Sequence, residues 1–263
     1  MINKISVPVG KICIFVLLTL GLFICSCKKP KPSEESPSQK SSGEQAPQDV
    51  NKPKGGDVNA VADACASVPL DIKLPKPMFV GTPQSINVPN MEKPRVGPRP
   101  QILVPQGVTN VALGKPVSST DQAPIIGELT MITDGDKEAA DGSYVELGPL
   151  VQSVTIDLQA EYNIYAIVVW HYHKQARVFF DVVVQVADDP DFITNVKTLF
   201  NNDNDNSSGL GIGKDLYYIE TSEGKLIDAK GVQGRYVRLY SKGNNSDDTN
   251  YYIEVEVFGK PAK

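Results

Sequence analysis

Two histidines, an aromatic residue and an arginine follow a strongly apolar run in the second half of the chain. Imidazole and guanidinium groups form hydrogen bonds with hydroxyls, and an aromatic ring offers a flat face on which a sugar ring can stack. A later loop is also rich in amide and aromatic side chains. The candidate ligand-binding set is therefore His171, Tyr172, His173, Arg177, Asn244 and Tyr252. The alternative is an ordinary strand end with exposed polar residues.

The same histidines raise the possibility of zinc, because His171 and His173 would share one face of a strand. A closed zinc site needs further nitrogen or sulfur ligands. The chain has only these two histidines, and the cysteine nearest to them in sequence is the distant Cys65. The sequence therefore disfavours zinc.

An acidic loop at 201–215 begins like an EF-hand, with Asp203, Asp205 and Ser207 at alternating positions. Its glycine stands one place late, and Lys214 occupies the position where calcium loops have glutamate. The glycines of the same loop do not form a phosphate-binding motif, because the first glycine and the final Ser or Thr of that motif are absent. A polar loop is the favoured interpretation.

Motifs of known enzymes are absent from the sequence. It contains no G-x-S-x-G and no H-E-x-x-H, and no cysteine lies near a histidine. Carboxylates are abundant enough for a paired-acid glycosidase. However, residues 107–263 hold 23 Asp and Glu against 13 Lys and Arg, which a solvated acidic surface explains more simply. We therefore expect a protein without catalytic activity.

The charge balance also indicates which kinds of partner the protein can bind. The chain of 263 residues has a formal net charge of -5 and a pI near 5.2. A nucleic-acid-binding surface needs clustered positive charge to release counterions from phosphate. The composition therefore argues against a nucleic-acid partner.

The N-terminal segment has the features of a secretory signal peptide. Lys4 and Lys11 precede an apolar stretch at 12–24, which is too short to span a bilayer. The following Ser26 and Cys27 resemble a bacterial lipobox, whose cysteine becomes diacylated. This resemblance predicts a signal peptide at 1–26 and a lipid anchor at Cys27 in a membrane of the bacterial cell envelope, with the rest of the chain extracytoplasmic.

The segment 27–106 is predicted to be a tether. Residues 28–106 hold 14 of the 20 prolines and one aromatic residue, Phe79. The first half is too polar to offset its conformational entropy and is predicted to be disordered. The second half carries Ile, Leu and Val between its prolines, so we expect extended pieces that lie along the folded domain. A short helical turn is expected at Val58–Ala66, and Cys65 has no assigned role.

The segment 107–263 is predicted to be one all-β domain. Alternation with period two recurs along it, for example at Val154–Leu158, Phe180–Val186 and Ile253–Val257. The run Ile164–Trp170 is apolar on both faces and is expected to be a central strand. Clusters of Gly, Asn and Asp separate these runs. About eight short strands predict a β-sandwich.

Several of these segments resemble the discoidin domain, also called the coagulation factor 5/8 type C domain. The matches are Asn110–Val117, Ile132–Asp136, Val154–Leu158, Ile164–Trp170, Arg235–Leu239 and Ile253–Gly259, in the family's order. The resemblance covers about 110–259. It implies a galactose-binding-like jelly roll of about eight antiparallel strands, with adjacent first and last strands and ligand loops at one end.

The resemblance also implies a calcium site, because carbohydrate-binding relatives commonly hold one ion where the first loop meets the last strand. Its ligands here would be the side chains of Asp134, Asp136 and Glu254 and the carbonyls of Met131 and Ala139. The ion would be structural. The alternative is an Asp-Gly turn whose carboxylates cap backbone amides.

Together these features favour a non-catalytic, carbohydrate-binding lipoprotein of the bacterial envelope, with a glycan and the lipid bilayer as partners. The alternative is a structural or adaptor module that binds an envelope protein through the 201–215 loop. A hydrolase with an unrecognised pair of carboxylates is a third and weaker hypothesis.

Overall fold

The structure is a computed structural model that describes residues 67–78 and 86–262. Several predictions fall outside these residues: the signal peptide, the lipid anchor at Cys27, disorder in the first half of the tether, the helical turn at Val58–Ala66, and Cys65. Within the described part, no helix is long and apolar enough to cross a membrane.

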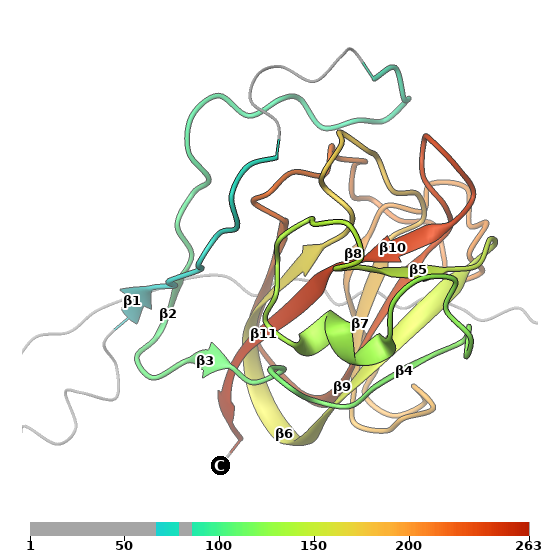
Figure 1. Cartoon of the computed structure of the whole chain (residues 1–263). Coiled ribbons are helices and arrows are strands. Elements are labelled where there is room, and N and C mark those ends of the chain that lie inside the picture. The colour runs from blue at the N-terminus through green and yellow to red at the C-terminus, as the bar shows by residue number, and fades with distance from the viewer. Residues whose placement is uncertain (1–66, 79–85, 263) are drawn as a thin grey trace, which may run out of the picture. The chain divides into compact units, whose positions relative to one another are not determined.

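In the described part of the chain, strands dominate. The helix found there is the short 3-10 helix η2 (Figure 1). The elements are β1 (Ser67–Pro69), β2 (Leu103–Pro105), β3 (Thr109–Asn110), β4 (Val117–Ser119), η2 (Leu129–Thr133), β5 (Val145–Leu147), β6 (Gln152–Trp170), β7 (Val183–Ala187), β8 (Lys197–Asn201), β9 (Lys225–Ser241), β10 (Asn250–Tyr252) and β11 (Glu254–Pro261). The all-β prediction for this part of the chain is confirmed.

The main sheet has the order β3-β11-β6-β9-β7-β8, and β4 pairs with β6 beside it. The first strand of the domain, β3, thus lies next to the last, β11, with Asn110 opposite Phe258. This is the arrangement that the discoidin resemblance implies. β5 and β10 form a separate two-stranded sheet.

The strand β6 joins two runs that the sequence pattern predicted as separate strands. Its pairing with β9 shifts between Asp157 and Tyr162, where Gln159 has a positive φ of 66°. A break of this kind bends a strand and increases its twist. Figure 1 accordingly shows β6 as a strongly curved ribbon, and its apolar second half lies between β11 and β9 as a central strand.

The core is built from the β-branched residues of the long strands. Ile167, Val168 and Val169 of β6 are fully buried, as are Val255 and Val257 of β11. Burial of each such side chain contributes about 1.5–3 kcal/mol. The strands that carry the loops are therefore anchored in a continuous apolar cluster.

The second half of the predicted tether packs on the domain. We call residues 67–78 and 86–106 the strap. Its strands β1 and β2 pair with each other, and its side chains Leu70, Ile72 and Ile102 pack against the core. Farther along, Met91 forms a parallel bridge with Tyr217. These contacts are of the kind expected for extended pieces that lie along the folded domain.

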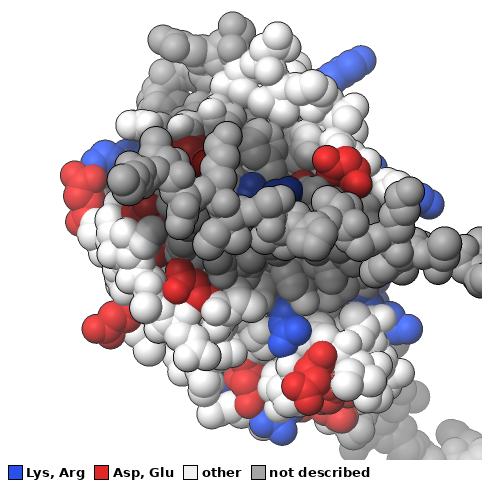
Figure 2. Space-filling view, turned by 90° about the vertical axis from the view of Figure 1, so that its right-hand side faces the viewer, with Lys and Arg blue, Asp and Glu red and all other residues white. Residues whose placement is uncertain are grey.

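Acidic and basic side chains are interspersed on the face of the molecule that Figure 2 shows. Among the described residues that this view shows, red and blue side chains lie intermixed, with no large patch of one sign.

Candidate functional site

One end of the domain gathers three tyrosines around Arg177. We call Tyr144, Tyr172, Arg177, Asp247 and Tyr251 the loop-end cluster. Tyr144 precedes β5, Tyr172 and Arg177 follow β6, and Asp247 precedes Tyr251 of β10. The pairing of β10 with β5 brings Tyr251 beside Glu146, close to Tyr144 in sequence. Strand pairing thus joins loops that are about 100 residues apart.

The guanidinium of Arg177 is held between two aromatic rings. Its Cζ lies 4.9 Å from the ring centroid of Tyr172 and 4.7 Å from that of Tyr251. Tyr144 packs against Tyr172 with a centroid separation of 5.0 Å and an edge-to-face angle of 66°. Such cation–π and aromatic contacts fix the direction in which the arginine donates.

Asp247 completes the cluster. Its Oδ2 lies 3.2 Å from Arg177 Nη1 and accepts a hydrogen bond from the Tyr251 hydroxyl at 3.2 Å. Burial alone would raise the pKa of Asp247, but hydrogen bonds from Thr249 and Asn244 and the charge of Arg177 lower it below the ordinary value. The carboxylate is therefore ionised at neutral pH and about one third exposed.

The cluster has one unpaired donor. Arg177 Nε is buried and has no hydrogen-bond partner within the described ranges. A buried donor without a partner costs about 1–3 kcal/mol. A ligand oxygen would relieve this cost if a neighbouring side chain moved to expose Nε. The adjacent Tyr144 ring is partly exposed and offers a face for stacking.

His171 and His173 do not belong to this surface. Both side chains are fully buried. His171 stacks on Phe179 at 4.5 Å and its Nδ1 lies 3.1 Å from Glu220 Oε2, while His173 Nε2 lies 3.0 Å from the carbonyl oxygen of Lys137. The interpretation of the two rings as surface donors to a sugar is corrected here, because the apolar run of β6 continues into the core through this segment.

Asn244 and Tyr252 support the loops from within. The Asn244 amide donates to Asp247 Oδ1 at 2.7 Å and to the Thr249 carbonyl at 3.0 Å. Tyr252 is fully buried, with its hydroxyl 3.1 Å from Ser241 Oγ. Both residues of the predicted set therefore position the loop-end cluster from below its surface.

Sequence reasoning selected Tyr172 and Arg177. It also indicated the polar-aromatic loop that holds Asp247 and Tyr251, but it chose Asn244 and Tyr252 from that loop, and it did not select Tyr144. Strand alternation is the signal that could have identified Tyr251, because successive side chains of a strand point to opposite faces. Tyr252 faces the core, so Tyr251 is the residue of β10 that meets Arg177. The contribution of Tyr144 depends on pairing between distant strands, which the local pattern does not encode.

The predicted calcium loop lies beside the start of β11, where Glu254 is the first residue. Glu254 is fully buried, and its Oε2 accepts a hydrogen bond from the Gly135 amide at 3.1 Å. Its Oε1 has no partner among the residues described. Burial raises the pKa of Glu254 to about 9.

Asp134 and Asp136 behave as turn residues. Each accepts a hydrogen bond from the backbone amide two residues ahead, at 2.8 and 2.9 Å. Both are exposed, Met131 is half-buried and Ala139 is fully buried. The loop therefore has the turn chemistry that the sequence allowed as an alternative, together with one buried carboxylate oxygen that lacks a partner.

A second set of acidic side chains lies close together in another part of the domain. Oxygens of Asp181, Asp203 and Asp205 lie within 4.8 Å of one another, an arrangement that could hold a metal ion. Asp203 already accepts hydrogen bonds from the Ser207 amide at 3.1 Å and the Ser208 amide at 2.8 Å. These bonds organise the 201–215 loop and support the prediction of a polar loop.

No protein-family model matches this sequence, and no curated protein matches it. Solved structures do. A family 89 glycoside hydrolase from Clostridium perfringens is 19% identical over 58% of this chain, with a TM-score of 0.42. The chain spans only 15% of the length of that hydrolase.

Two further similar structures are binding modules. A CBM32 module from Clostridium perfringens, in complex with GlcNAc-α-1,4-galactose, is 18% identical over 58% of this chain and 95% of its own, with a TM-score of 0.42. A fucose-binding module from Streptococcus pneumoniae is 17% identical over 59% and 99%, with a TM-score of 0.40. Identities and scores this low leave the question of a ligand to the chain's own geometry.

Proposed function

We propose that this protein is a non-catalytic carbohydrate-binding lipoprotein of the bacterial cell envelope. The loop-end cluster would bind the glycan, and diacylated Cys27 would hold the chain to a membrane. The single observation that carries the binding proposal is Arg177, which is clamped by two tyrosine rings and keeps one donor unpaired.

The chemistry of the cluster suits a sugar. A pyranose ring has an apolar face that stacks on an aromatic side chain and hydroxyls that both donate and accept. Tyr144 would supply the stacking face, Arg177 Nε would donate to a ring or hydroxyl oxygen, and Asp247 would accept from a hydroxyl. The three groups come from three loops, so their relative position depends on the intact sandwich.

The calcium proposal concerns stability. Glu254 fits a hard cation, because one of its buried oxygens lacks a partner among the described residues. Burial raises its pKa to about 9 even with Lys137 nearby, and a bound cation would favour the ionised carboxylate. Glu254 would supply the buried carboxylate, with the side chains of Asp134 and Asp136 and the carbonyls of Met131 and Ala139 completing the oxygen ligands. The ion would fasten the first loop to β11.

A glycan array probed with the full chain tests the binding proposal. We expect saturable binding to a subset of glycans, reduced at least about tenfold by Arg177→Met, which keeps an apolar side chain of similar length between the rings but loses the donors. The matched control is Arg238→Met, since Arg238 lies on β9 and bonds Thr155 and Pro190. A blank array, or equal binding by both variants, would contradict the proposal.

The anchor has its own test. Radiolabelled fatty acid is expected to be incorporated into the chain, and Cys27→Ala is expected to abolish the incorporation. Label that persists in this variant would show that Cys27 is not the lipidated residue.

A further inference from the structure

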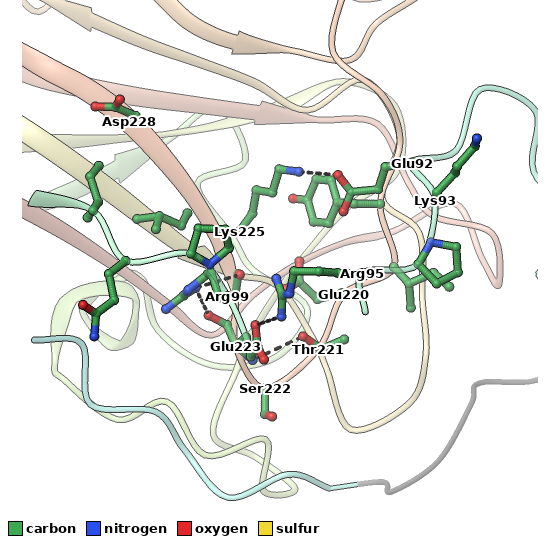
Figure 3. Close-up of a pocket in the computed structure, with 18 of the residues that line it drawn as sticks. Glu92, Lys93, Arg95, Arg99, Glu220, Thr221, Ser222, Glu223, Lys225 and Asp228 are labelled. Atoms are coloured by element: carbon green, nitrogen blue, oxygen red, sulfur yellow. Dashed lines mark hydrogen bonds and ion pairs between the residues drawn. The ribbon is translucent and has the colours of Figure 1, made fainter. Parts of the chain in front are cut away.

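A cavity of about 870 Å³ lies between the strap and residues 218–228 (Figure 3). Its size falls within the range of small-molecule sites. None of the five residues of the loop-end cluster lines it. It is therefore separate from the proposed glycan site.

The inner wall of the cavity is rigid. Gly224 has a φ of 64°, and a Cβ at this position would lie 2.8 Å from the ring of Trp170. Trp170 Nε1 donates to the Ser222 carbonyl at 3.0 Å, and Arg99 Nη1 of the strap donates to the Glu223 carbonyl at 2.6 Å. The loop 221–224 is thus held from both sides, which makes the cavity a preformed feature.

Two of the four cations that line the cavity are paired with carboxylates. Lys225 pairs with Glu92 at 3.0 Å, and Arg95 pairs with Glu223, as the dashed lines in Figure 3 show. The ammonium of Lys225 also lies 4.4 Å from the ring centroid of Tyr218. These contacts use the strap's charges to fasten it to the domain.

Two polar atoms of the wall have no partner in the described part of the chain, namely Glu220 Oε1 and the Tyr218 hydroxyl. Glu220 and Tyr218 are 1% and 3% exposed. The other carboxylate oxygen of Glu220 is already 3.1 Å from His171 Nδ1. An ionised carboxylate can only accept hydrogen bonds, so Glu220 Oε1 lacks a donor.

We propose that this cavity binds the side chain of a lysine presented by another polypeptide. An ammonium group is a donor with three hydrogens and no acceptor, which matches what Glu220 Oε1 lacks. A charge-assisted bond formed away from bulk water is among the stronger hydrogen bonds.

The rest of the lining suits the same ligand. Met78, Ile102 and Leu226 offer apolar contacts to the methylene stem of a lysine, which buries its carbons along apolar surface when its head group is paired. The cavity is also larger than one side chain, which leaves space for the flanking peptide. Exposed strap residues such as Lys93 and Arg95 would move aside to admit it.

Calorimetric titration of the full chain with the blocked tripeptide Ala-Lys-Ala tests this proposal. The matched probes carry Nε-acetyl-lysine or norleucine in place of lysine, so that only the ammonium changes. We expect the lysine peptide to bind at least about tenfold more tightly than either control. Trp170 is the single tryptophan and packs behind the wall, so its emission should change on binding.

Two variants separate a site from a structural role. Glu220→Gln keeps the shape and the contact with His171 but removes the charge, and it is expected to lose the preference for lysine. Tyr218→Phe removes an unpaired hydroxyl, so it should fold normally and still bind more weakly. The control Glu146→Gln alters the loop end and should leave peptide binding unchanged. Equal binding of all three peptides, or unchanged binding by Glu220→Gln, would overturn the proposal, whatever the glycan array shows.

Discussion

The loop-end cluster and the strap cavity offer opposite chemistry to a ligand. At the loop end the polar groups bond one another, and what remains is an unpaired donor, Arg177 Nε. In the cavity Lys225 and Arg95 pair with carboxylates, and the unpaired atoms in the described residues include an acceptor, Glu220 Oε1. The backbone links the two regions, because the Glu220 amide donates to the Arg177 carbonyl at 2.8 Å.

This difference indicates that the buried unpaired atoms of a region say more about the ligand it could bind than its amino-acid composition does. Both regions contain tyrosine, arginine and carboxylates, so a count of residue types would treat them as alike. Their unpaired groups predict an oxygen-rich ligand for one and an ammonium for the other.

The largest expected effect concerns the cavity wall. Gly224→Ala places a Cβ against the Trp170 ring, and we expect it to destabilise the fold by about 1–3 kcal/mol more than Gly114→Ala. The control has a similar positive φ of 67°, with nothing within 4 Å of its Cβ. Urea unfolding measures both variants. Equal losses would show that the wall yields and that the cavity is not preformed.

The second-largest expected effect is the gain in stability when calcium binds. If Glu254 holds an ion, calcium at about ten times its Kd should stabilise the chain by about 1.4 kcal/mol, since it binds only the folded state, and chelator should reverse the gain. Glu254→Gln should remove the gain, whereas Glu161→Gln, an exposed control, should keep it. Thermal melts with and without calcium measure the shift. No shift in the unaltered chain would leave Gly135 and Glu254 as a turn contact alone.

A pair of tyrosines tests the contrast between paired and unpaired groups. The Tyr251 hydroxyl donates to Asp247 and to Glu146, so Tyr251→Phe should cost about 1 kcal/mol. The Tyr218 hydroxyl has no partner in the described region, so Tyr218→Phe should be neutral or stabilising. Denaturant midpoints give the difference. A larger loss for Tyr218→Phe would mean that its hydroxyl is satisfied in solution.

The smallest effect is a pH-dependent ion pair far from both sites. The bidentate contact of Arg235 holds the pKa of Asp157 below its ordinary value. Its contribution is therefore present above the unfolded pKa of aspartate and is lost as pH falls through the lower folded pKa. Arg235→Met should lower the free energy of unfolding slightly at pH 7, and this loss should become smaller in strong acid. Arg238 bonds two neutral groups, so Arg238→Met should lower stability without this dependence on acid.

The sequence predicted the sandwich because its strands carry their own signal. Alternation at Val154–Leu158 and the two-sided apolar run at Ile164–Trp170 reflect burial directly. The merger of these runs into one bent strand was not predicted, because the bend depends on the bulge at Gln159 and on pairing with β9.

The site was only partly predictable. Tyr172 and Arg177 stand where a strand gives way to a loop, and composition indicated them. His171 and His173 were placed at the surface because histidine is usually polar and exposed, whereas pairing with Glu220 and the Lys137 carbonyl allows both rings to be buried. The cavity left no local signal, since it arises only when the strap packs across residues 218–228.

The most direct test of the central claim is a crossed titration with two variants and two ligands. Arg177→Met should lose the glycan found on the array and keep the lysine peptide, and Glu220→Gln should do the reverse, each by at least about tenfold. The chain should begin before Ser67 in any shortened form, since Leu70 and Ile102 pack on the core. Glycan binding that survives Arg177→Met, or that is lost equally in both variants, would contradict the assignment of the glycan to the loop-end cluster.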